Sequence, residues 1–298
     1  MQIVRTSSLL YTVAMASIIG GGAAVIGWKA TPFGAWVGLI PVLLIAVWGL
    51  RRPLRRWRVA RQAFPEAWSR WLRRHIPMYE RLSAEGRQHF ERDVQFFIDE
   101  HTFEGIQGVE ITDELRLSVA AAAALLLHGR PTWELPGGQS VLLYPGSFDE
   151  NYFGGDYAEF DGMAHQQGPI LLSAQSVRES WATPDDGSNV VLHELAHLFD
   201  FENTGADGIP SLINPASEGS WQSLVRKEMK RIRRGKSMLR RYGATAPSEF
   251  FAVAVEAFFE QPDEMEERHP ELFAALKAFF HLDPRRGIEM PAEAAEAA

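Results

Sequence analysis

The sequence predicts an α+β protein in which a mainly helical domain with a small sheet follows a hairpin of two transmembrane helices. Two uncharged apolar runs occupy most of the N-terminal region. Beyond them, apolar residues recur mainly at three- and four-residue steps, the period of helices, and only a few short segments resemble strands. The expected divisions are residues 1–62 for the hairpin with a basic flank, 63–288 for the folded domain and 289–298 for a disordered Ala/Glu-rich tail.

The two apolar runs are long enough to cross a bilayer. Residues 9–28 form a run of twenty without a charge, and residues 33–50 form a second run of eighteen after the break at Lys29 and Pro32. A cleavable signal peptide is the alternative for the first run, but a removed signal would not need a membrane span directly behind it. Two buried helices of a soluble protein fit poorly, because the first run contains three consecutive glycines and neither run has a polar face.

Arginines follow the second run: six lie within residues 51–61, against one lysine in the turn. Because Lys and Arg are enriched on the cytoplasmic side, the sequence predicts an inner (cytoplasmic) membrane protein whose termini and folded domain face the cytosol. Nucleic-acid binding is the alternative for these charges, but a membrane flank attracted to anionic headgroups explains their position, so no nucleic-acid partner is expected. The chain has no cysteine, which excludes disulfides and Cys-built metal sites.

Helical periodicity marks three parts of the folded domain. Residues 64–100 carry aromatic and aliphatic side chains at three- and four-residue steps, and residues 115–127 form a stretch rich in alanine and leucine. The strongly basic stretch 221–241 predicts an amphipathic surface helix, with attraction of a substrate or partner as the alternative reading.

Short β-like segments lie between these helices. Residues 103–111, 141–144 and 168–173 are predicted strands, and the polar stretch 151–167 is expected to be a loop or an irregular hairpin.

Residues 189–200, reading N-V-V-L-H-E-L-A-H-L-F-D, carry the motif around which the domain is organised. His193 and His197 are four residues apart, so on a helix they share one face and can bind one ion. Glu194 lies on an adjacent strip, where it can take a proton from a water on that ion, as in zinc peptidases. A pair of core histidines is the alternative. In zinc peptidases a strand beside the metal-binding helix often holds the substrate through backbone hydrogen bonds, and residues 168–173 are the strand expected there. The polar residues 185–188 offer a helix cap and acidic groups near its positive end.

A second helix should supply the third ligand. Residues 245–249, with Pro247 in the first turn, indicate a helix start ahead of a very apolar stretch. Glu249 and Glu256 share one face of it, and a carboxylate buried there needs a cation or hydrogen-bond donors. A Zn²⁺ ion bound by two histidines and a glutamate, with water in the fourth position, is a catalytic arrangement. Spacing alone leaves both glutamates open.

The motif H-E-L-A-H-L-F-D, together with Y-x6-E-F-F-A-V-x-x-E, resembles the Mlc titration factor A (MtfA) family of zinc peptidases. The metal site of that family is similar to that of anthrax lethal factor, so the resemblance implies a zincin-like domain. It covers about residues 64–286 of the chain. The family is linked to binding the glucose repressor Mlc, which implies a transcription-regulator partner, although a membrane-tied member is not expected to sequester that repressor in the same way.

The resemblance also assigns two residues. It implies that Glu249 is the third zinc ligand and that Tyr242, seven positions earlier, lies near the metal, where its phenol would donate to an oxyanion. An ordinary half-buried tyrosine is the alternative for Tyr242. Asp200 and Glu256 are each placed to accept a hydrogen bond from a ligand imidazole, with a helix-terminal surface acid as the alternative for Asp200.

The predicted function is that of a membrane-anchored zinc metallopeptidase that hydrolyses peptide bonds with Glu194 as general base. His193, His197 and Glu249 would hold the zinc, Tyr242 would steady the oxyanion, and a peptide or protein is the expected substrate. The alternative is a regulatory binding protein of the same fold that captures a transcriptional regulator, with peptidase activity secondary. A purely structural, membrane-tethered helical domain is a further alternative.

Overall fold

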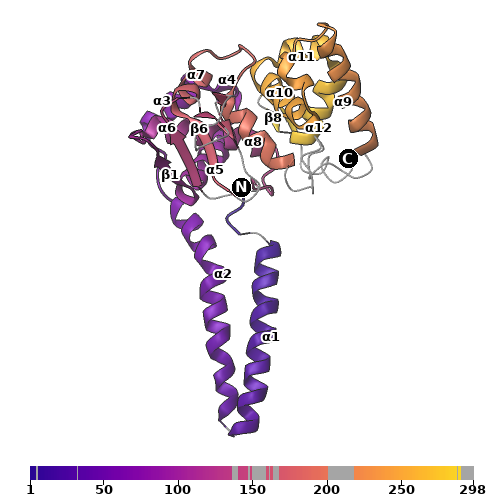
Figure 1. Cartoon of the computed structure of the whole chain (residues 1–298). Coiled ribbons are helices and arrows are strands. Elements are labelled where there is room, and N and C mark those ends of the chain that lie inside the picture. The colour runs from indigo at the N-terminus through magenta and orange to yellow at the C-terminus, as the bar shows by residue number, and fades with distance from the viewer. Residues whose placement is uncertain are drawn as a thin grey trace. The chain divides into compact units, whose positions relative to one another are not determined.

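The computed structural model describes residues 1–4, 6–31, 33–135, 140–146, 148–149, 159–160, 162–163, 168–200, 218–286 and 288–289. The chain forms two compact units, Met1–Ala63 and Phe64–Ala298, whose α-helices are labelled in Figure 1. The first unit is a helical hairpin, and the second is a mainly helical domain with a small sheet. The predicted α+β class is therefore confirmed. The tail expected to be disordered falls, from residue 290 on, outside the described residues.

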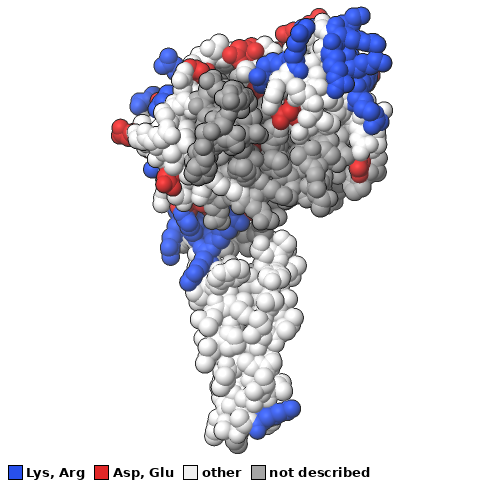
Figure 2. Space-filling model, in the orientation of Figure 1, with Lys and Arg blue, Asp and Glu red and all other residues white. Residues whose placement is uncertain are grey.

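The hairpin consists of α1 (Thr6–Ala30), the short 3₁₀ helix η1 (Gly34–Gly38) and α2 (Leu39–Val59). Both limbs are long and apolar enough to cross a membrane. Their large side chains lie on the outside: Leu10 and Trp28 are each 65% exposed. In Figure 2 the visible face of the hairpin is uncharged along its length, with basic residues at its ends. An exposed apolar surface of this extent indicates contact with lipid or with another protein.

Glycines bring the two limbs of the hairpin together. Gly27 on α1 faces Gly34 at the start of η1, and a Cβ on either glycine would overlap the backbone of the other. A Cβ on Gly38 would likewise overlap the carbonyl oxygen of Gly20. Small residues allow transmembrane helices to approach this closely. Of the three consecutive glycines in the first run, Gly20 is therefore a contact point of the hairpin, together with Gly27, Gly34 and Gly38.

The second unit is built mainly from helices. They are α3 (Glu66–His75), α4 (Pro77–Arg81), α5 (Ala84–Glu100), α6 (Asp113–Leu127), α7 (Ala174–Ala182), α8 (Val190–Asp200), α9 (Glu218–Arg233), α10 (Pro247–Glu260), α11 (Pro262–Arg268) and α12 (Pro270–Phe280), with the 3₁₀ turn η3 (Arg241–Ala244). The helical prediction for residues 64–100 and 115–127 is confirmed. Alanines 120–124 of α6 are fully buried, which places this helix at the centre of the domain.

The basic stretch of the sequence forms α9. Trp221, Val225 and Ile232 give the helix a buried side, while lysines and arginines gather on the opposite surface, which is visible in Figure 2. The helix was expected to run to residue 241 but ends at Arg233. Gly235 follows with a φ of 67°, a left-handed conformation that favours glycine and stops a helix.

The sheet has four described strands in the order β1 (Thr102–Gly105), β2 (Ser140–Tyr144), β6 (Ile170–Ser173) and β5 (Gly162–Met163). β2 is parallel to β1 and β6, and β5 is antiparallel to β6. Residues 168–173, expected to hold a substrate through backbone hydrogen bonds, form β6, whose residues Leu171 and Leu172 are paired with both β2 and β5. β1 and β5 are the edge strands of the described sheet, and both β5 and β6 contact α8.

The described residues also form two short strand pairs: β3 (Phe148–Asp149) with β4 (Glu159–Phe160), and β7 (Leu282–Asp283) with β8 (Ile288–Glu289). β4 and β5 lie within the stretch predicted as a loop or irregular hairpin. The rest of that stretch lies outside the described residues.

The start of α8 is capped by Asn189. Its side-chain oxygen accepts a hydrogen bond from the Leu192 amide at 3.1 Å, and its carbonyl oxygen accepts the first helical bond from the His193 amide at 2.9 Å. The cap therefore follows the polar residues 185–188 rather than lying among them. α8 packs against α6 and α10, and α10 begins with Pro247 in its first turn as the sequence predicts.

Candidate metal centre

The two histidines of the motif lie on one face of α8. The neighbouring Leu192, Leu195 and Ala196 are fully buried, so the helix is held in the core and its polar face is fixed in direction. The Nε2 atoms of His193 and His197 are 3.2 Å apart. The i, i+4 spacing thus brings both ring nitrogens to one point, as helix geometry requires.

Glu249 on α10 meets this pair of nitrogens. Its Oε2 atom lies 3.1 Å from Nε2 of His193 and 3.6 Å from Nε2 of His197. One ligand atom from each residue lies within 4.8 Å of the other two, which makes this a group that could hold a metal ion. Burial raises the pKa of the Glu249 carboxyl, but hydrogen bonds and the charges of the two histidines hold it well below its usual range. The carboxylate is therefore available as an anionic ligand.

Glu256 lies on the side of the His193 ring that is opposite Glu249. It is fully buried, and its Oε1 atom lies 2.7 Å from Nδ1 of His193. The same oxygen accepts a hydrogen bond from Arg240, and Oε2 accepts one from the Asn189 amide at 2.6 Å. Because Nδ1 donates to this carboxylate, Nε2 is the ring nitrogen that faces His197 and Glu249, which is the ring orientation that a metal ligand needs.

The electrostatics of the cluster call for a cation. Burial lowers the pKa of His193, but its hydrogen bonds with Glu249 and Glu256 raise it to about 10. The two carboxylates thus favour a positive charge at the His193 ring. Two imidazole nitrogens and one carboxylate oxygen are the ligands that Zn²⁺ takes in catalytic sites, so the residues present fit that ion.

Glu194 points from the same helix and is 6% exposed. Burial raises the pKa of its carboxyl, while the charges of His193 and His197 lower it. A carboxylate whose pKa is raised by its surroundings is a stronger proton acceptor than one in water. Its charge interacts with those of His193, His197 and Glu249, so the carboxyl lies near the cluster.

Tyr242 lies on η3, at the edge of the cluster. Its ring centroid is 5.9 Å from that of His193, and the residue is 45% exposed. Burial of the phenol, together with the charge of Glu249 and a hydrogen bond to it, raises the pKa of Tyr242 to about 12. The hydroxyl therefore keeps its proton at neutral pH and can act as a donor near the cluster.

Three residues that support the cluster were not singled out in the sequence: Asn189, Arg240 and Glu260. Glu260 lies one turn beyond Glu256 and accepts hydrogen bonds from the Asn189 side chain at 3.2 Å and from the Asp185 amide at 2.9 Å. Asn189 ahead of an apolar helix is an N-cap signal that the sequence does contain. Nothing in the sequence marks Arg240 apart from the other basic residues near it. The side chain of Asp200 lies outside the described part of the chain.

Comparison with known proteins agrees with this geometry. The sequence profile of the glucose-regulated metallopeptidases M90 matches residues 51–281. Mlc titration factor A of Cronobacter sakazakii is 30% identical over 230 residues, which cover 70% of this chain and 84% of that protein. The Mlc titration factor A of Pectobacterium atrosepticum is 28% identical over 228 residues, with the same shares covered. The uncharacterised protein slr2042 of Synechocystis sp. is 28% identical over 258 residues, which cover 81% of this chain and 94% of that protein.

Proposed function

The chain belongs to the glucose-regulated metallopeptidase family M90, as the resemblance of its two motifs predicted, and on this premise we propose that it is a membrane-anchored, zinc-dependent peptidase. The observation that carries the proposal is the convergence of His193, His197 and Glu249 from two helices on one point. The substrate is a peptide or protein on the cytosolic side of the inner membrane. The anchor is the apolar hairpin, whose limbs are long enough to span a bilayer.

His193, His197 and Glu249 are the residues that would hold the zinc ion. When bound, zinc supplies a Lewis acid that lowers the pKa of a water towards about 7 and polarises the scissile carbonyl. The chain’s own residues prepare this site. Glu256 fixes the His193 ring through Nδ1, and Arg240 and the Asn189 amide hold Glu256 in turn.

Two side chains carry the proton and charge movements. Glu194 accepts the proton of the attacking water and then delivers it to the nitrogen of the leaving amine. Burial raises the pKa of this carboxyl, which suits it to both steps. Tyr242 donates its hydroxyl to the oxygen of the carbonyl as negative charge develops there, and the pKa of about 12 keeps that hydroxyl protonated.

The edge strand β5 supports a way to hold the substrate. β5 contacts α8 and ends the described sheet, so an extended peptide could add to it as a further strand. Backbone hydrogen bonds of this kind recognise a peptide by its main chain, so they favour proteins with an exposed extended segment.

The test is peptide hydrolysis by the purified full-length protein in detergent. We expect activity to be lost in a zinc chelator and restored by zinc. Glu194→Gln should lower kcat by about 10²–10⁴-fold while one zinc ion per chain is retained, because the ligands are intact. Glu267→Gln, an exposed carboxyl on α11, is the matched control and should leave the rate unchanged. Equal rates with and without the chelator, or an intact rate in Glu194→Gln, would contradict the proposal.

A second candidate function is capture of a transcriptional regulator, with hydrolysis secondary. The observation that favours it is the name of two relatives, which describes them as titration factors of Mlc. Under this function the Glu194→Gln variant keeps the cellular phenotype of the wild type and still retains a regulator in a pull-down. If the variant loses the phenotype, the peptidase function is favoured instead.

A further inference from the structure

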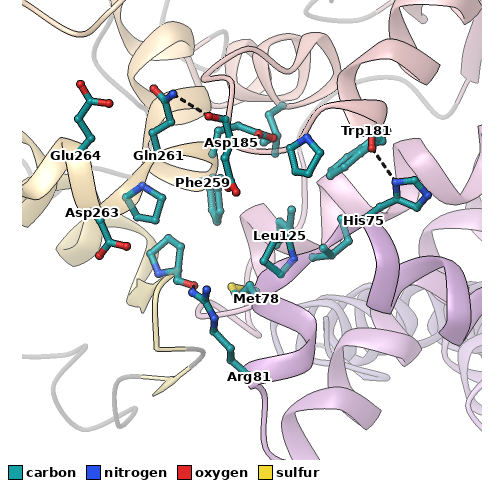
Figure 3. A pocket seen from close by; sticks show the side chains of 17 residues that line it. His75, Met78, Arg81, Leu125, Trp181, Asp185, Phe259, Gln261, Asp263 and Glu264 are labelled. Atoms are coloured by element: carbon teal, nitrogen blue, oxygen red, sulfur yellow. Dashed lines mark hydrogen bonds between the residues drawn. The ribbon is translucent and has the colours of Figure 1, made fainter.

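A cavity of about 310 Å³ lies in the second unit, apart from the metal centre. Its walls come from the α3–α4 junction, the ends of α6 and α7, and the α10–α11 junction, as Figure 3 shows. None of the proposed zinc ligands lines it. Its volume lies at the lower end of the range of small-molecule sites.

The walls of the cavity are largely apolar and include two aromatic rings. Met78, Leu125, Trp181, Leu192 and Phe259 supply carbon surface, and Figure 3 shows several of these side chains around the open space. The edge of the cavity also carries four acidic residues and one arginine. A pocket with an apolar body and a few convergent polar groups has the character of a ligand site.

Most of the charged residues at the cavity already have partners. Arg81 donates to the carbonyl oxygens of Pro284 and Arg285, at 3.5 and 2.8 Å. Glu264 pairs with Arg268 at 2.6 Å, and Asp263 lies 3.8 Å from Arg285. These groups do not need a ligand to balance them.

Glu260 and Asp185 are different. Glu260 is 7% exposed, and the partners recorded for its carboxylate are neutral N–H groups, those of Asp185 and Asn189. Asp185 is exposed, and its carboxylate has no hydrogen-bond or ion-pair partner among the described residues. Burial, helped by the charges of Asp186 and Asp185, raises the pKa of Glu260 to about 7. Arg81 lines the same cavity but donates to backbone carbonyls, so in the described part of the chain no cation pairs with these two carboxylates.

We propose that this cavity is a second ligand site, which binds a small organic cation through its apolar walls and through the carboxylates of Glu260 and Asp185. An ammonium group at the Glu260 end offsets the negative charge of the two carboxylates, and an apolar body fills the space between Trp181, Phe259 and Leu125. Ammonium groups also interact favourably with the faces of aromatic rings. The site goes beyond the proposed peptidase function and does not depend on it.

The experiment compares three probes with the same apolar body and different charge. Benzylammonium, benzyl alcohol and benzoate are titrated into the full-length protein in detergent at about pH 8, with ligand-observed NMR and empty micelles as the blank. We expect saturable millimolar binding of benzylammonium, at least about tenfold weaker binding of benzyl alcohol, and no saturable binding of benzoate.

Variants place the binding at this cavity. Glu260→Gln and Asp185→Asn should each weaken benzylammonium binding by about tenfold. Asp185 is exposed, so its replacement does not threaten the fold. Glu267→Gln, on α11 but outside the cavity, should bind as the wild type does. Equal affinity for benzyl alcohol, unchanged affinity in both variants, or no saturable binding up to about 50 mM would overturn the proposal. Each result is read without an activity assay, so it is separate from the test of the peptidase function.

Discussion

Nδ1 of His193 lies 2.7 Å from Oε1 of Glu256, on the side of the ring opposite Glu249. One imidazole is therefore held between two carboxylates of α10 that are two turns apart. Glu249 lies beside Nε2, the ring nitrogen that faces His197, and Glu256 lies beside Nδ1, which faces away from His197. The two glutamates are equivalent by helical spacing, but this arrangement gives them different tasks.

Glu256→Gln tests the positioning task. Glutamine keeps the size of the side chain but removes the charge that receives the Nδ1 proton of His193. We expect zinc affinity to fall by about 10–100-fold, measured by competition with a chromophoric chelator. Glu267→Gln should keep wild-type affinity. If Glu256→Gln binds zinc as tightly as the wild type, Glu256 supports only the fold.

Tyr242→Phe tests the oxyanion role. The ring remains, so substrate packing and zinc content should be preserved, while the donor to the oxyanion is lost. We expect kcat to fall by about 10²–10³-fold with little change in KM. Tyr79→Phe removes a phenol that donates to Glu91 elsewhere in the domain, and it should leave kcat unchanged. A large rise in KM with an unchanged kcat would show that Tyr242 binds substrate instead.

Local sequence patterns correctly predicted the two helices that carry the candidate metal centre. The four-residue spacing of His193 and His197 requires their rings to meet once residues 190–200 are helical, and Pro247 marks the start of the second helix. Both signals lie within a few turns of the chain. The apolar runs of the hairpin are equally local, because length and composition alone mark them.

Contacts between distant segments could not be predicted in the same way. The sheet order places β5 beyond β6, and this depends on pairings that no local pattern encodes. Arg240 reaches Glu256 only because the chain turns at Gly235 and re-enters through η3. The choice between Glu249 and Glu256 likewise depends on how α10 packs on α8, since both residues share a face.

The carboxyl of Glu260 should make stability depend on pH. Burial is the main cause that raises the pKa of this carboxyl from its ordinary value to about 7. The folded state therefore binds the carboxyl proton more tightly than the unfolded state does. The resulting stabilisation is fully present below about pH 4.5 and is lost as the pH rises through about 7. Glu260→Gln removes that dependence.

The measurement is the free energy of unfolding of wild type and Glu260→Gln at a series of pH values. The wild type should lose about 1–3 kcal/mol relative to the variant between about pH 4.5 and 8. Other titrating groups are common to both proteins and cancel in the difference. Parallel curves would mean that Glu260 titrates in its ordinary range.

The membrane orientation can be read with single cysteines, because the chain has none of its own. Thr31 lies at the tip of the hairpin, and Gln62 follows the arginines after α2. Because basic flanks stay in the cytosol, an impermeant maleimide should label Thr31→Cys in intact cells stripped of their outer membrane. It should label Gln62→Cys only after lysis, which also shows that this thiol is reactive. The opposite pattern would place the peptidase domain outside the cell, and labelling of both only after lysis would mean that the hairpin does not cross the membrane.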